Sequence, residues 1–205
     1  MPICLSIQQT KVKGFEMSGF SLRTSSLVIV GASLLSACGG GGGEEDGPQA
    51  FGPTPQVPAS VPAAQACDIP DFAAQMLAAI NEARATARTC GGTSFAPARA
   101  LAWNDQLAQA AAKHSSDMAS RNFVSHTGSD GSSAADRANA AGYRGAVGEN
   151  LAGGQTSVGQ MMNELLRSPA HCANLMDPAY RTAGAACVSN RSTTYKTHWT
   201  QMLGR

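Results

Sequence analysis

Residues 185–203 read AACVSNRSTTYKTHWTQML, and this stretch decides the fold class. Its two halves, AACVS and TYKTHWTQML, contain Val, Thr, Tyr and Trp, which are favoured in strands, and the polar segment NRST between them is typical of a turn. The stretch therefore predicts a β-hairpin. The segments before it have helical spacing, and a hairpin packed on helices predicts an α+β fold.

Apolar periodicity and capping residues predict four helices before this hairpin. The second follows Asn104, a good N-cap, and its narrow face of small residues permits a close neighbour. Ser133 with Asp136 resembles a capping box for the third. Pro169 must end the fourth at Ser168. The predicted helices cover about 72–83, 105–118, 134–141 and 158–168.

Composition excludes one class of partner. The 205 residues have a formal net charge of +1, and 14% are charged, so no basic surface is available to follow a phosphate backbone. We expect no nucleic-acid partner. With 43% hydrophobic residues the chain can bury one core, and we expect a single folded domain and a monomer.

The beginning of the chain is typical of an export signal. Arg23 precedes the apolar run LVIVGASLL, which is too short to span a membrane and leads into Leu35-Ser36-Ala37-Cys38. This segment resembles a bacterial lipobox, which implies cleavage before Cys38 and lipidation of its thiol. Two or more acyl chains anchor a protein stably, so we expect a membrane partner. An ordinary cleaved signal is the alternative.

This interpretation divides the chain into three parts. Residues 1–37 are the signal region, with Met17 as a candidate true start. Residues 38–66, rich in Gly and Pro, form a tether, and residues 67–205 form the folded domain. Gly39 after Cys38 favours the outer membrane, if the organism has one, by resemblance to lipoprotein sorting. We therefore expect an extracytoplasmic, lipid-anchored protein.

Export also determines how the other cysteines of the folded domain are interpreted, because an exported protein meets an oxidising compartment, which favours disulfides. These cysteines are Cys67, Cys90, Cys172 and Cys187. Four cysteines allow three pairings. We predict the neighbour pairing, in which each bridge closes a short loop; a four-cysteine zinc site is the alternative, although no CxxC spacing supports it. The predicted bridges are Cys67–Cys90 and Cys172–Cys187.

Three polar residues lie where helices end or glycines interrupt the pattern, and such positions often build sites. His126 follows the second helix in SHTGSDG, His171 follows the fourth in SPAHCANLM, and Glu149 lies in GENLAGG. Their spacing matches no metalloprotease helix motif. His114 and His198 are interpreted as structural.

Five ordered segments resemble the bacterial branch of the CAP family, the SCP-like extracellular proteins related to cysteine-rich secretory proteins, antigen 5 and pathogenesis-related 1. The resemblance spans about residues 72–204 and implies a three-layer α-β-α sandwich. The segments are LAWNDQLAQAAAKHSSDMA, NFVSHTGSDG, DRANAAGYRGAVGENLAGG, LLRSPAHCANLMDPAYRTAGAA and THWTQMLG.

The resemblance also implies a cavity with two histidines and two glutamates. His126, Glu149 and His171 match three of these positions, with His126 and His171 as ligands for zinc or another divalent cation. The second glutamate falls at Ser168, so one carboxylate is missing, which weakens any two-carboxylate acid/base chemistry.

Three functions remain open. The first is a lipid-anchored protein that binds a divalent cation or a small apolar ligand, such as a lipid, in this cavity. The second is a metal-assisted hydrolase with Glu149 as base. The third is a surface adhesin held together by disulfides. The sequence favours a binding role over an enzyme.

Overall fold

The computed structural model describes residue 62 and residues 65–205. The predicted signal region, the lipidation site Cys38 and most of the tether lie outside the described residues. Ala66 pairs with Cys187 in an isolated parallel bridge, so the described domain includes the segment at Ala66. Within the described part of the chain, no helix is both long enough and apolar enough to cross a membrane.

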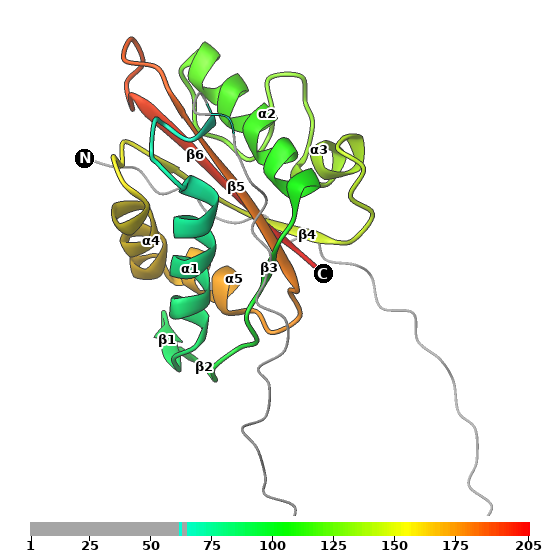
Figure 1. The fold of residues 1–205 in the computed structure, drawn as a ribbon, viewed down its shortest axis with the longest axis vertical. Helices are drawn as coiled ribbons and strands as arrows, with labels where there is room; N and C mark the ends of the chain where they lie inside the picture. Colours follow the sequence, from blue (N-terminus) through cyan, green and yellow to red (C-terminus); the bar gives the residue numbers. More distant parts are fainter. Residues whose placement is uncertain (1–61, 63–64) are drawn as a thin grey trace, which may run out of the picture. The chain divides into compact units, whose positions relative to one another are not determined.

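A four-stranded sheet forms the middle layer of the domain, in the order β3-β5-β6-β4 (Figure 1). β5 and β6 form the predicted antiparallel hairpin, β4 continues it antiparallel, and β3 pairs with β5 in parallel. The strands are β3 (Ala102–Trp103), β4 (Val147–Gly153), β5 (Thr182–Ser189) and β6 (Thr197–Gly204).

Helices cover both faces of this sheet (Figure 1). On one face lie α1 (Phe72–Arg84), α4 (Val158–Arg167) and α5 (Pro169–Met176). On the other face lie α2 (Asp105–Arg121) and α3 (Ala134–Ala140). This is the predicted three-layer α-β-α sandwich. A small second sheet joins β1 (Arg88–Cys90) to β2 (Thr93–Phe95).

Local sequence signals explain three of the helix starts. The Asn104 side chain accepts a hydrogen bond from the Leu107 amide at 2.9 Å, as expected of an N-cap. The predicted capping box of Ser133 and Asp136 is present in both directions. The Ser157 hydroxyl caps α4 by accepting a hydrogen bond from the Gln160 amide at 3.2 Å. All four predicted helices are confirmed, and Ser168 is the C-cap of the fourth.

Residues 169–176 correct the sequence prediction, because they form a fifth helix in the described part of the chain. Pro169 does end α4, but it also occupies the first turn of α5. Proline is favoured there, since the amide it lacks would have no helical partner. His171 therefore lies on a helix and not in the loop that the sequence predicted.

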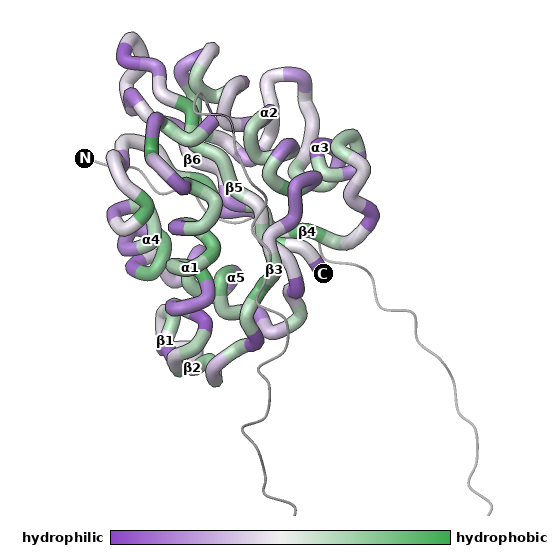
Figure 2. The backbone as a smooth tube through the Cα atoms, in the orientation of Figure 1, coloured by the Kyte–Doolittle hydropathy of each residue, from purple (hydrophilic) through white to green (hydrophobic). Residues whose placement is uncertain are grey.

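The two faces of the sheet are packed differently. The side chains of Trp199 and Leu203 point to the α1 face, where they join the large apolar core formed with α1, α4 and α5. On the α2 face the contact is closer, because a Cβ on Gly184 would collide with the backbone of Leu107 and Ala108. Figure 2 shows hydrophobic and hydrophilic residues alternating along the helices, and hydrophilic residues in many of the connecting loops.

The disulfide pairing predicted from the sequence is wrong. The structure joins Cys67 to Cys187 and Cys90 to Cys172, with Cα–Cα distances of 5.2 and 5.5 Å. The prediction favoured short loops, but the fold places the segment at Ala66 beside β5 and places α5 against the small β1–β2 sheet. Bridges over long loops remove more entropy from the unfolded chain than bridges over short ones.

Candidate functional site

Glu149 is the centre of the candidate site. It lies on β4, opposite Met202 of β6, and only 5% of it is exposed. One carboxylate oxygen, Oε1, lies 2.8 Å from Nδ1 of His126, and the other, Oε2, accepts a hydrogen bond from Nη2 of Arg137 at 2.7 Å. The structure therefore brings together two of the three residues predicted from the sequence, and both oxygens of the carboxylate are occupied.

Arg137 supplies the charge that balances this buried carboxylate. It lies on α3 and is 2% exposed. Its guanidinium also donates to the main-chain oxygens of Ser132, at 2.7 Å, and His126, at 3.0 Å. A buried ion pair is tolerated only when further hydrogen bonds compensate for lost solvent, and Arg137 has them. It therefore ties α3 and the α2–α3 connection to β4.

His126 is oriented by this arrangement. Because a carboxylate only accepts hydrogen bonds, Nδ1 of His126 must carry the proton and donate to Glu149. The other ring nitrogen, Nε2, is buried and has no hydrogen-bond partner in the described structure. In a neutral imidazole this nitrogen keeps its lone pair, so His126 presents one nitrogen that can bind a cation.

His114 supports the loop that carries His126. Its Nε2 lies 2.8 Å from the main-chain oxygen of Ser125, the residue before His126. Burial lowers the pKa of His114, an effect that nearby Glu149 opposes and Arg137 reinforces. This hydrogen bond agrees with the interpretation of His114 as a structural residue.

His171 is fully buried on α5, and a network of amides attaches this helix to β4. Its main-chain oxygen accepts from Asn150, the neighbour of Glu149, at 3.5 Å. Asn174 donates to the side chain of Asn150 at 2.9 Å and accepts from the Tyr180 hydroxyl at 2.9 Å. The structure thus places His171 on a helix that is fixed beside the strand carrying Glu149.

Ser168 takes a structural position. It is the last residue before α5 and occupies the N-cap, although its side chain makes no capping hydrogen bond. Its main-chain oxygen accepts from the Cys172 amide at 2.8 Å and so begins the helix. Ser168 therefore positions His171 through the backbone.

Two observations bear on which ligand the site suits. Among the described residues, no group of three or more His, Cys, Asp or Glu side chains is arranged to hold a metal ion. A hollow of about 240 Å³ beside Arg137 and His114 is lined by charged and hydroxyl side chains, including Lys113, Asp117 and Asp130. The site therefore offers few protein ligands to a cation, and its surroundings are polar.

Arg137 is the functional residue that sequence reasoning missed. The sequence did indicate Glu149 as a site residue, because it lies in the glycine-flanked segment GENLAGG. Nothing in the sequence, however, distinguished Arg137 on its short helix from an arginine exposed to solvent. Only the packing of α3 against α2 and β4 shows which cation is buried.

Two solved structures are similar to this chain over about half of its length. A search of curated proteins gave no match. An extracellular protein containing an SCP domain from Bacillus anthracis str. Ames matches with 27% identity and a TM-score of 0.47, over 53% of this chain and 34% of its own length. An outer surface protein from Borrelia burgdorferi matches with 20% identity and a TM-score of 0.46, over 53% of this chain and 79% of its own. This chain thus corresponds to about a third of the Bacillus protein.

The family comparison covers more of the chain. The sequence profile of the CAP family, described as the cysteine-rich secretory protein family, matches residues 77–203. That range includes the buried cluster of His126, Arg137 and Glu149, and also His171. The chain belongs to the CAP, or cysteine-rich secretory protein, family.

Proposed function

We propose that this protein is an extracytoplasmic, membrane-tethered CAP domain whose site binds a divalent cation through His126, with His171 as the second nitrogen donor. One observation carries the proposal: Glu149 fixes the ring of His126 so that its buried Nε2 faces no protein partner. Carboxylates orient metal-binding histidines in this way in known sites.

The donor set suits a cation that keeps open positions. Neutral imidazole nitrogens are good ligands for zinc and other divalent transition metals. A bound cation would supply a positive charge and coordination positions for a further ligand. Arg137 already balances the charge of Glu149, so the carboxylate serves to orient His126 and is not itself needed as a metal ligand.

The polar surroundings favour a cation over a small apolar ligand at this place. The adjacent hollow is lined by lysine, arginine, aspartate and serine side chains, which an apolar molecule would have to desolvate without compensation. The hydrolase hypothesis has less support, because Glu149 is only 5% exposed and each of its carboxylate oxygens already has a protein partner, so neither faces open solvent.

Calorimetric zinc titration of the tag-free, oxidised protein tests the proposal. We expect stoichiometric binding by the wild type and its loss in the His126→Ala/His171→Ala variant. His198→Gln is the matched control, because it removes a different buried histidine and should retain binding. Glu149→Gln should weaken binding about 10–100-fold if the variant is folded. Absence of binding in the wild type, or equal binding in the double variant, would refute the proposal.

The membrane tether is a separate part of this proposal and rests on Leu35-Ser36-Ala37-Cys38. The wild type should separate into the detergent phase in Triton X-114 partitioning and incorporate labelled palmitate. Cys38→Ser should do neither, whereas Cys4→Ser should behave like the wild type. Equal partitioning of Cys38→Ser and wild type would show that an ordinary cleaved signal is present.

A further inference from the structure

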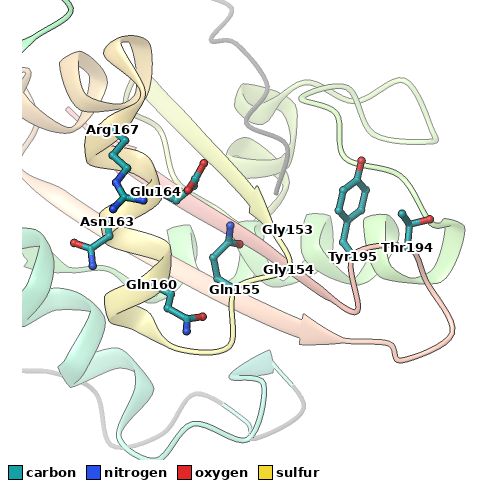
Figure 3. A pocket seen from close by; sticks show the side chains of 9 residues that line it. All are labelled: Gly153, Gly154, Gln155, Gln160, Asn163, Glu164, Arg167, Thr194 and Tyr195. Atoms are coloured by element: carbon teal, nitrogen blue, oxygen red, sulfur yellow. The ribbon is translucent and has the colours of Figure 1, made fainter. Parts of the chain in front are cut away.

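A second hollow lies apart from the Glu149 cluster, where the turn after β4 meets α4 and the β5–β6 connection (Figure 3). Its volume is about 550 Å³, within the usual range for small-molecule sites. Its lining includes Gly153 and Gly154, and Tyr195 packs directly over Gly153. None of the residues that line it belongs to the site described above.

Gln155 is the unusual residue of this hollow. It is only 5% exposed, yet both its amide nitrogen Nε2 and its amide oxygen Oε1 are buried without a hydrogen-bond partner in the described structure. Its backbone is fixed, because its main-chain oxygen accepts from the Thr197 hydroxyl at 2.8 Å and from the Trp199 indole at 3.0 Å. Buried polar groups are normally satisfied, because each one left unpaired destabilises the folded protein.

The α4 side of the hollow adds polar side chains that have hydrogen-bonding capacity to spare. Gln160 uses only its Oε1, which accepts from the Thr156 amide at 2.9 Å, so its NH₂ group remains available. Glu164 and Arg167 take part in none of the ion pairs of the described residues, although they face the same hollow. Figure 3 shows Gln155 between these α4 side chains and Tyr195.

Tyr195 forms the opposite wall and is held in place. Its ring meets that of His198 edge-on, with centroids 6.0 Å apart and planes at 90°. It also lies so close to Gly153 that a Cβ there would be 3.0 Å from the tyrosine Cγ. A half-buried, fixed aromatic ring provides flat contact area with a polar hydroxyl at one end.

We propose that this hollow binds a sugar ring of an extracellular glycan. Each hydroxyl of a sugar both donates and accepts, so two adjacent hydroxyls complement the donor and the acceptor that Gln155 holds side by side. The apolar C–H face of the ring would pack on Tyr195, while Gln160 and Asn163 reach its outer hydroxyls. An apolar ligand would leave the Gln155 amide unsatisfied. This inference does not depend on cation binding at His126.

The test is a ¹⁵N NMR titration of the oxidised full-length chain with cellotetraose, mannotetraose and N-acetylchitotetraose at millimolar concentration. We expect saturable shifts of the side-chain amides of Gln155, Gln160 and Asn163 with at least one of these probes. Gln155→Met and Tyr195→Ala should each weaken that binding about tenfold or more, as expected for losing a buried hydrogen-bonding group or a stacking surface. Gln109→Met, on the exposed side of α2, is the matched control and should bind normally.

Two further measurements make a negative result informative. Asn163→Ala changes an exposed residue of α4, so it should weaken binding without affecting folding even if a buried variant is unstable. Zinc titration of the same variants should be unchanged, which separates this site from the His126 site. Absence of saturable shifts with all three oligosaccharides, or binding that survives both Gln155→Met and Tyr195→Ala, would overturn the proposal.

Discussion

Two buried polar residues near opposite ends of β4 differ in how they are satisfied. Glu149 has a partner for each carboxylate oxygen, one on the α2–α3 connection and one on α3. Gln155, just beyond the end of β4, has a partner for neither atom of its side-chain amide. Both residues are 5% exposed, so burial alone does not explain the difference.

The carboxylate of Glu149 is a buried polar group that stabilises the fold, whereas the side-chain amide of Gln155 is one that we propose binds a ligand. Removing a satisfied partner leaves a buried charge uncompensated, which is costly. Removing an unsatisfied group takes away only a desolvation penalty. Measurements of stability should therefore respond to the two positions in opposite ways.

The largest effect is expected for Glu149→Gln. This change leaves the guanidinium of Arg137, which is 2% exposed, without a counter-charge. We expect a loss of about 3–5 kcal/mol in the free energy of unfolding, measured by urea denaturation followed by circular dichroism. The control is Glu164→Gln on α4, which forms no ion pair among the described residues and should change stability by less than about 0.5 kcal/mol. Equal stability of the two variants would show that the cluster does not hold the fold.

A smaller effect is expected when both charges are removed together. In Arg137→Met/Glu149→Leu no buried charge is left without a partner, so the double variant should lie within about 2 kcal/mol of the wild type and above Glu149→Gln. The same denaturation experiment measures it. If the double variant is less stable than Glu149→Gln, the hydrogen bonds of Arg137 to Ser132 and His126 matter more than the charge balance.

Acidification should lower the stability of the folded protein through His114, which supports the loop that carries His126. Burial lowers the pKa of His114 below its ordinary value of 6.5, so the unfolded chain binds a proton more readily than the folded one. Neutral His114 therefore contributes its full stabilisation of the folded state above about pH 6.5, and this contribution is lost as the pH falls below that value. Thermal unfolding of wild type and His114→Gln between pH 7.5 and 5 measures this. The midpoint should fall less with pH in the variant, and identical slopes would exclude His114 as the cause.

The sequence predicted the local features of this fold more successfully than the distant ones. Asn104, Ser133 and Ser157 cap helices through residues three positions away, so their effect is visible in the sequence. α5 was missed because Pro169 serves two purposes at once, as the end of one helix and the first turn of the next. β4 was missed because its glycines conceal a strand; Gly148 is needed since a Cβ there would collide with the Tyr180 hydroxyl.

The residues of the candidate site show the same difference between features that are local in the sequence and features that depend on tertiary packing. Glu149 and His126 were found from the sequence through the family resemblance, and the structure confirms that they meet. Arg137 and the pairing of Cys90 with Cys172 could not be found, because both depend on which elements pack together in three dimensions. Gln155 gave no signal at all, since a glutamine after a turn is usually exposed.

The smallest effect on stability, and the sharpest contrast with Glu149, is expected at Gln155. Gln155→Met keeps the length of the side chain and removes two buried polar atoms that have no partner. Because no protein hydrogen bond is lost and a desolvation penalty is relieved, the thermal unfolding midpoint should stay the same or rise. Differential scanning calorimetry measures it, with Gln201→Met as the matched control. Gln201 is fully buried and accepts a hydrogen bond from Asn150 at 2.9 Å, so its replacement should lower the midpoint. A comparable fall in both variants would mean that Gln155 has a structural partner after all, and the distinction between the two ends of β4 would fail.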